Sequence, residues 1–182
     1  MLGANGAGKS TLLRLLVNLL NPHQGEINCY GEYESLSYLG HDLQLYLDLT
    51  VSQNLAFFTS LWGGDCDDAM QYWSLLEYKD RAVKTLSQGQ KKRVALAVSY
   101  LTTPHLSLLD EPSSNLDVLG ANLLKEKLLQ CGNHNACIVA SHNLRFFADW
   151  CNRVLVIDDC LISQYEGLSP EEIKEIYLKV LR

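Results

Sequence analysis

The chain has 182 residues, of which 47% are hydrophobic and 20% charged, and this fits one domain with a sizeable core. Its formal net charge of −6 argues against a broad basic surface, so we expect no nucleic-acid partner. No apolar run is long enough to cross a bilayer, so a membrane role requires a partner protein. The six cysteines contain no C-x-x-C pair, which favours reduced thiols.

The chain begins with a glycine-rich stretch that leads into a helix. Residues Gly3–Ser10 match G-x-x-x-x-G-K-[ST] at every specified position, and leucine spacing predicts a helix over Ser10–Leu20. Small residues let backbone N–H groups surround phosphate oxygens at a helix N-terminus, while Lys9 neutralises the β- and γ-phosphates and Ser10 ligates Mg²⁺. The residues expected to hold ATP here are Gly3, Ala4, Asn5, Gly6, Ala7, Gly8, Lys9, Ser10 and Thr11.

Strand and helix patterns then alternate along the chain. Strands are predicted at 26–30, 36–39, 106–109, 136–140 and 154–157. Helices are predicted at 51–76, broken by a turn at Gly63–Asp65, and at 88–101, 118–131, 144–150 and from Pro170 onward. Because most strands are separated by helices, the pattern predicts an α/β fold with a largely parallel sheet. The helical stretch from about 51 to 101 is expected to be a subdomain inserted in that α/β body.

Two adjacent acids end the apolar stretch Leu106–Leu109. A buried strand of this kind can deliver Asp110 to Mg²⁺ through water and Glu111 to the hydrolytic water. We therefore expect Asp110 to be a metal residue, together with Ser10, and Glu111 to be the general base.

The stretch Leu86-Ser87-Gln88-Gly89-Gln90 precedes this acidic strand and resembles the signature LSGGQ of the nucleotide-binding subunits of ABC transporters, with Gln88 in place of the first glycine. The resemblance covers Gly3 to Leu181. It implies a P-loop NTPase fold of the ABC type, with residues 1–182 forming a single nucleotide-binding domain. It also implies that Ser87, Gly89 and Gln90 contact the γ-phosphate held by a second subunit, in a head-to-tail homodimer.

Two further residues follow the acidic strand in the order that this family has. The resemblance implies that Asp117, in Ser113–Asp117, lies in the loop that crosses the dimer interface. It implies that His142 is the switch histidine that touches the γ-phosphate. As a member of the family, the subunit would hydrolyse ATP and bind integral membrane subunits at the cytoplasmic face of the inner membrane.

A second histidine, His41, marks a departure from the family pattern. Most members have a glutamine at the position of His41, where it contacts Mg²⁺ and its water and links the nucleotide to the membrane subunit through the helical insert. The stretch Tyr38-Leu39-Gly40-His41 resembles the ATP-binding subunit of the heme exporter used in cytochrome c maturation. This implies a role for His41 in catalysis and a role for the chain in heme export.

Other functions stay open at this point. The chain could serve export of a different substrate, because in such systems the membrane subunits meet the transported molecule. It could also be a non-hydrolysing scaffold that keeps the fold and the partner surface. A DNA- or ribosome-associated ABC ATPase is disfavoured by the single phosphate loop, the acidic balance and the lack of a long heptad arm.

The start of the chain differs from what the family resemblance implies. Only Met1 and Leu2 precede the loop, whereas a family member would have several strands and an adenine-stacking aromatic residue there. We therefore expect a longer native polypeptide, a loop without its feeding strand, and an empty strand slot in the sheet.

The run Lys91–Arg93 is expected to be solvated. Four aromatic residues, Phe57, Phe58, Trp62 and Trp73, are expected in the core.

Overall fold

The computed structural model describes residues 1–28, 35–130, 135–148, 151–159 and 161–180. The described strands form two three-stranded sheets, with orders β1-β5-β6 and β2-β3-β4. The strands are β1 (Leu2–Gly3), β2 (Leu36–Leu39), β3 (Leu106–Asp110), β4 (Ala136–Ala140), β5 (Arg153–Asp158) and β6 (Leu161–Glu166). All pairs are parallel except β5 with β6, so the largely parallel α/β sheet is confirmed.

The first three residues join the two sheets. Leu2 and Gly3 pair in parallel with Val156 and Ile157 of β5. On the other side, the α-amino group of Met1 donates to the carbonyl oxygen of Val139 at 2.6 Å, and Ser141 N–H donates to Met1 O at 3.2 Å. The expectation of a loop without a feeding strand is therefore wrong, since even two residues pair with β5 and continue into the loop.

Below this short strand, a cavity of about 730 Å³ separates β4 from β5. Residues 136–139 and 153–155 line its two sides, and Met1 and Leu2 close one end. The described sheet thus has a space of the kind expected for a strand slot.

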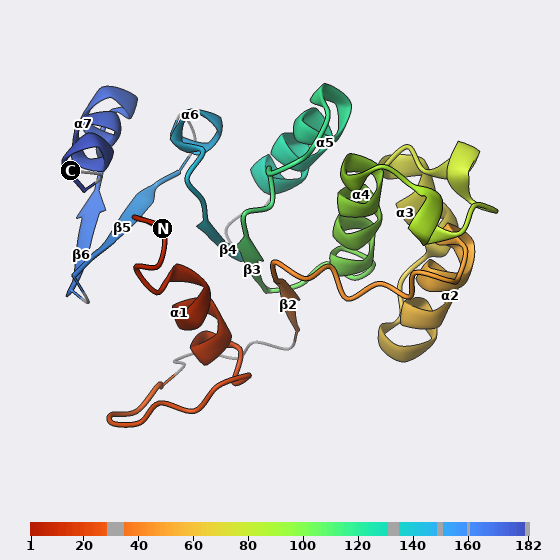
Figure 1. Cartoon of the computed structure of the whole chain (residues 1–182), viewed down its shortest axis with the longest axis horizontal. Helices are drawn as coiled ribbons and strands as arrows, with labels where there is room; N and C mark the ends of the chain where they lie inside the picture. Colours follow the sequence, from red (N-terminus) through yellow and green to blue (C-terminus); the bar gives the residue numbers. More distant parts are fainter. Residues whose placement is uncertain (29–34, 131–134, 149–150, 160, 181–182) are drawn as a thin grey trace.

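Helices cover both faces of the strands (Figure 1). The α-helices are α1 (Lys9–Leu16), α2 (Val51–Trp62), α3 (Cys66–Tyr72), α4 (Gln88–Ser99), α5 (Val118–Leu129), α6 (Leu144–Phe147) and α7 (Pro170–Val180), with short 3₁₀ helices at Leu76–Tyr78 and Val83–Thr85. In the figure, α1 lies on one face of the strands, α5, α6 and α7 lie on the other, and α2, α3 and α4 gather at the end beyond β2. Among the described residues, no helix has both the length and the apolar character needed to span a bilayer.

Helix α1 fixes the start of the chain against the acidic strand. Leu13 is fully buried and packs with Leu108 of β3 and Ala140 of β4. The helix ends earlier than predicted, because Asn18 takes a left-handed conformation with φ of 57°. Leu19 and Leu20 are consequently exposed and do not extend the core.

The largest core cluster lies among α2, α3 and α4. Trp73 is 1% exposed there, and Phe58 is also buried, as predicted. Phe57 and Trp62 are instead 38% and 55% exposed, which corrects the expectation that all four aromatic residues lie in the core. These two side chains lie on the outer side of α2, which the apolar spacing of the sequence did not reveal.

The basic run on α4 is also not solvated as expected. Lys92 and Arg93 are only 5% and 3% exposed, because α4 packs against neighbours on most sides and Val94–Val98 are buried as well. Arg93 donates to the carbonyl oxygens of Trp73 and Ser74 at 3.4 and 3.2 Å. The guanidinium therefore ties α4 to the chain that follows α3.

Two predicted elements differ from the described chain. Residues 26–28 form no strand, and the remainder of the predicted strand over 26–30 lies outside the described residues. Strand β6 was not predicted, because all six of its side chains are exposed and give no alternating pattern.

Candidate functional site

The glycine-rich loop has the backbone that its sequence requires. Gly6 and Gly8 take left-handed conformations, with φ of 84° and 96°, and Gly8 is the N-cap of α1. A Cβ at Gly3 would lie 2.6 Å from the carbonyl oxygen of Ile157, so only glycine lets β1 approach β5 at this point. The loop therefore brings the N–H groups of the first turn of α1 to the end of β1, which is the arrangement that binds anions.

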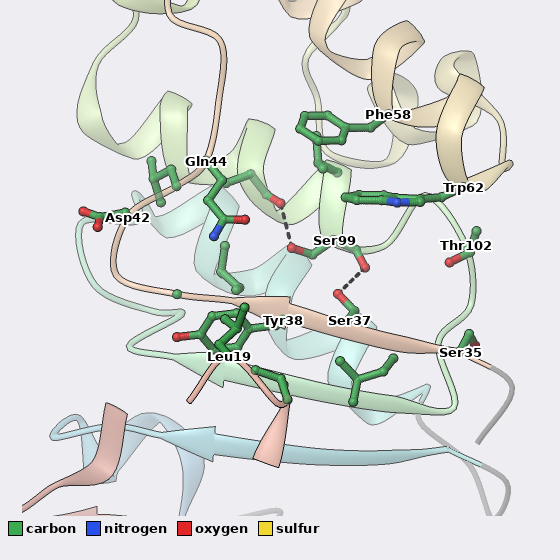
Figure 2. A pocket seen from close by; sticks show the side chains of 17 residues that line it. Leu19, Ser35, Ser37, Tyr38, Asp42, Gln44, Phe58, Trp62, Ser99 and Thr102 are labelled. Atoms are coloured by element: carbon green, nitrogen blue, oxygen red, sulfur yellow. Dashed lines mark hydrogen bonds between the residues drawn. The ribbon is translucent and has the colours of Figure 1, made fainter. Parts of the chain in front are cut away.

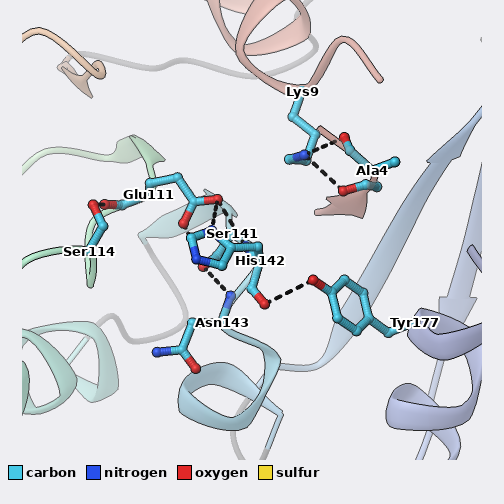
Figure 3. A network of polar contacts seen from close by, with 9 residues as sticks. Ala4, Lys9, Glu111, Ser114, Ser141, His142, Asn143 and Tyr177 are labelled. Atoms are coloured by element: carbon cyan, nitrogen blue, oxygen red, sulfur yellow. Dashed lines mark hydrogen bonds and ion pairs between the residues drawn. The ribbon is translucent and has the colours of Figure 1, made fainter. Parts of the chain in front are cut away.

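Lys9 turns back onto this loop. Its Nζ atom donates to the carbonyl oxygens of Gly3 and Ala4 at 2.8 and 2.9 Å, and the side chain is buried (Figure 3). The ammonium group therefore lies directly at the loop, within reach of an anion bound there.

Asp110 ends β3, and its buried carboxylate is suited to bind a cation. It is 3% exposed, and its Oδ2 atom is buried without a hydrogen-bond partner among the described residues. A buried carboxylate oxygen of this kind is costly unless it is paired, and Mg²⁺ takes one or two carboxylates, a hydroxyl and phosphate oxygens. Asp110, with the hydroxyl of Ser10 in the first turn of α1, fits such an ion bound together with nucleotide phosphates.

The buried side chain of Lys92 interacts electrostatically with Asp110 and Glu111. Burial lowers the pKa of Lys92 below its usual value, and the charges of Asp110 and Glu111 act in the opposite direction. The basic run Lys91–Arg93 suggested a solvated face, so the sequence did not predict the position of Lys92 beside the acids.

Glu111 lies directly after Asp110 and holds the histidine loop, residues 141–143, which follows β4 (Figure 3). Its backbone is left-handed, with φ of 47°, and its N–H donates to Ala140 O at 2.8 Å. Its Oε1 atom accepts from His142 N–H at 2.9 Å and lies 2.8 Å from His142 Nδ1, while Oε2 accepts from Ser141 Oγ at 3.1 Å. The structure thus brings together two predicted catalytic residues that are 31 positions apart in the chain.

Ser141 connects this pair to the phosphate loop. Its Oγ atom accepts from Asn143 N–H at 3.0 Å, and its own N–H donates to Met1 O, at the start of the strand that enters the loop. Ser141 was not singled out from the sequence, although it is the neighbour of His142.

The residues of Leu86–Gln90 lie at the start of α4. Ser87 and Gln90 form a capping box, in which Ser87 Oγ accepts from Gln90 N–H at 3.2 Å and Gln90 Oε1 accepts from Ser87 N–H at 2.9 Å. Among the described residues, no hydrogen bond joins 87–90 to 3–10. Within one chain, then, this stretch and the phosphate loop are not brought together.

Gly89 and Asp117 connect that stretch to the loop after Glu111. A Cβ at Gly89 would lie 2.7 Å from Asn115 O, so glycine permits this close approach. Asp117 caps α5 by accepting from Gly120 N–H at 2.8 Å, and its Oδ2 atom lies 3.6 Å from Arg93 Nη2. Within this chain Asp117 therefore acts as a helix cap.

His41 follows β2 and is exposed, in a loop that Asn54 holds in place. The fully buried amide of Asn54 accepts from Tyr46 N–H and donates to Tyr46 O, both at 2.9 Å, and to Thr50 O at 3.0 Å. No sequence motif identified Asn54, because its role depends on the path of a loop rather than on spacing.

A groove of about 520 Å³ lies beside this loop, between β2 and the helices α2 and α4 (Figure 2). Ser37 and Tyr38 come from β2, Phe58 and Trp62 from α2, and Ser99 from α4. Trp62 stacks on Phe58 with ring centroids 4.9 Å apart, so the groove has an aromatic wall that is partly exposed.

Comparison with known proteins agrees with this arrangement. The family described as "ABC transporter" matches residues 1–114. An uncharacterized ABC transporter ATP-binding protein of Methanocaldococcus jannaschii is 33% identical over 189 residues, covering 100% of this chain and 71% of that protein. The ABC transporter ATP-binding protein NatA of Bacillus subtilis is 28% identical over 207 residues, covering 100% and 84%.

The chain is also similar to the cytochrome c biogenesis ATP-binding export protein CcmA of Salmonella typhi, with 39% identity over 135 residues, covering 69% of this chain and 66% of that protein. Among solved structures, an ATP-binding subunit of an ABC transporter superposes with a TM-score of 0.84 at 21% identity, covering 97% of this chain and 86% of the other. The predicted ABC-type fold is thereby confirmed. The chain belongs to the ABC transporter family, in which it is an ATP-binding subunit.

Proposed function

We propose that this subunit hydrolyses ATP, with Glu111 as the general base and His142 as its partner at the γ-phosphate. The observation that carries this proposal is the Glu111–His142 contact, which lies at the ends of β3 and β4 beside the strand that enters the phosphate loop. A carboxylate that is held by an imidazole and a backbone N–H is oriented for proton transfer from a water molecule.

The remaining residues of the site have distinct roles in this proposal. The N–H groups at the start of α1 bind the phosphates, and Lys9 exchanges its carbonyl partners for β- and γ-phosphate oxygens. Ser10 and Asp110 would hold Mg²⁺, which when bound neutralises phosphate charge. Glu111 accepts the proton of the attacking water, and the imidazole of His142 keeps that carboxylate in place.

A second copy of the chain completes the site in this proposal. Ser87 and Gln88 are exposed at the N-terminus of α4, where partial positive charge favours an anion. In a head-to-tail homodimer, Ser87, Gly89 and Gln90 of one subunit would contact the γ-phosphate bound by the other, and Asp117 would lie at the interface.

The proposed membrane partner docks beside His41. ABC ATP-binding subunits associate with membrane transporter subunits, and the aromatic groove next to the His41 loop offers partly exposed apolar surface for such a contact. Movement of His41 would then transmit nucleotide binding to the partner. In this proposal the subunit is peripheral, at the cytoplasmic face of the inner membrane.

Heme export in cytochrome c maturation is the specific transport function that we propose. The stretch Tyr38–His41 and the similarity to CcmA support it. Export of another substrate is the second candidate, favoured by relatives such as NatA that match this chain over its whole length. Affinity purification from membranes discriminates the two: recovery of a heme-export membrane subunit is expected, and recovery of a membrane subunit from another export system would exclude heme export.

Titration of the purified chain with ATP and Mg²⁺ tests the enzymatic part. We expect saturable binding and phosphate release. A folded protein that retains its partner surface but does not bind nucleotide would instead be the non-hydrolysing scaffold.

A further inference from the structure

The last helix reaches the histidine loop from outside the nucleotide motifs. The hydroxyl group of Tyr177, on α7, donates to the backbone carbonyl oxygen of His142 at 3.1 Å (Figure 3). Nothing in the sequence pattern marks Tyr177, because the contact joins two residues that are 35 positions apart.

Helix α7 is fixed firmly enough to hold such a contact. Ser169 and Glu172 cap its start, with Glu172 Oε2 accepting from Ser169 N–H at 2.8 Å and Ser169 Oγ accepting from Glu172 N–H at 3.3 Å. One turn further on, Ile173 is 1% exposed and packs with Leu2 of β1 and Val156 of β5. The position of Tyr177 is therefore set by the sheet that carries the phosphate loop.

The histidine loop belongs to the other sheet, since it follows β4. On its inner side, the carboxylate of Glu111 binds the N–H and the imidazole of His142. On its outer side, Tyr177 binds the carbonyl group of the same residue. The two partners hold the peptide groups before and after the His142 Cα atom, and these groups set the direction of its side chain.

We propose that Tyr177 is a positioning residue for His142. Its hydroxyl group fixes the His142 carbonyl, which keeps the imidazole directed at Glu111 and couples the histidine loop to the sheet of the phosphate loop. This inference rests on the role proposed above for His142 in hydrolysis. It adds a residue of the C-terminal helix that does not touch nucleotide and acts only through the histidine.

Substitution of Tyr177 by Phe tests the inference, because it removes the hydroxyl group and keeps the ring. A single hydrogen bond of this kind contributes about 0.5–1.5 kcal/mol, so we expect kcat for Mg-ATP hydrolysis to fall about 2- to 10-fold while KM stays unchanged. Backbone amides of 141–143 should exchange with deuterium faster in the variant. Tyr165→Phe is the matched control: Tyr165 lies on β6, and its hydroxyl group has no hydrogen bond among the described residues, so this substitution should change neither kcat nor the exchange rates.

A double-mutant cycle separates positioning from a general structural effect. In a His142→Ala background, Tyr177→Phe should cause no further loss of kcat, because the residue through which it acts is gone. An equal loss in both backgrounds, or unchanged kcat and exchange in Tyr177→Phe, would overturn the proposal.

These experiments distinguish failure of the proposed ATP hydrolysis from failure of the proposed role of Tyr177. If the unsubstituted chain does not hydrolyse ATP, hydrolysis is refuted and the exchange measurement decides on Tyr177. Faster exchange of 141–143 then supports positioning of the loop, and unchanged exchange contradicts it.

Discussion

The Nδ1 atom of His142 lies 2.8 Å from Oε1 of Glu111, and the same oxygen accepts a hydrogen bond from the backbone N–H of His142. One carboxylate oxygen therefore holds both the side chain and the main chain of the histidine. Because Glu111 follows β3 and His142 follows β4, the contact also fixes the ends of two neighbouring strands to each other.

Ser87 offers a test of the dimeric site. A bulky substitution, Ser87→Phe, should abolish hydrolysis in the dimer and leave ATP binding to the subunit's own loop intact, because among the described residues Ser87 has no hydrogen bond to that loop. Radiolabelled ATP binding and phosphate release measure the two effects.

Asp65→Phe is the control for loss of a helix cap. Asp65 is exposed and caps α3 through the N–H groups of Asp67 and Asp68, so its substitution destabilises a helix away from Ser87. It should leave hydrolysis unchanged. Full-rate hydrolysis by Ser87→Phe, or by isolated monomers, would refute the contribution of a second subunit.

Asn54 is expected to be a major contributor to stability although no motif includes it. Substitution by Ala removes the acceptor of Tyr46 N–H and the side-chain donor to Tyr46 O and Thr50 O, which keep their backbone donors Leu49 N–H and residue 54 N–H. The unpaired Tyr46 N–H and the lost packing of a fully buried side chain should lower the free energy of unfolding by ~1–3 kcal/mol. Urea denaturation measures this. Asn122→Ala, at an exposed position of α5, should change it by less than ~0.5 kcal/mol. Similar values for the two variants would show that the loop after His41 does not depend on Asn54.

The α-amino group of Met1 predicts a pH dependence in a polypeptide that starts there. Burial lowers its pKa from 8.0 to about 6, with smaller opposing effects from Cys151, Cys137 and Glu111, and a further lowering by Lys9. Between these two pH values the unfolded chain binds more protons than the folded one, so stability rises with pH. The gain from pH 6 to 8 should approach ~2–3 kcal/mol.

Acetylation of the Met1 amino group provides the comparison for this effect. It removes the titrating charge and keeps one N–H for the carbonyl of Val139. The acetylated chain should therefore show a smaller rise of unfolding free energy over the same pH range, while all other titrating groups stay the same. Identical slopes for both forms would contradict a buried ammonium group at this position.

Much of the site could be predicted because its residues occur in short motifs. The phosphate loop and the Asp110–Glu111 pair are local, and their spacing relative to a helix and a strand determines their geometry. Tyr177 and Asn54 could not be predicted, since their contacts depend on the path of the folded chain and not on a local motif. Asn54 binds a loop that lies before it in the chain, and Tyr177 reaches His142 from the last helix.

The errors about burial have a common physical origin. A run of three basic residues suggests a solvated surface, yet α4 is buried on most sides, so Lys92 and Arg93 are enclosed as well. Conversely, helix α2 has apolar residues on more than one side, and only some of them face α3 and α4. Trp62 lies on the remaining side and is 55% exposed.

The most direct test of the central claim is the turnover of Mg-ATP by the Glu111→Gln variant beside the unsubstituted chain. The amide keeps the size of the side chain and removes its basicity, so we expect ATP affinity to stay the same and kcat to fall ~10²-fold or more. Measurement of ATP binding in the same preparations controls for folding. Equal turnover by the two proteins would show that Glu111 is not the general base.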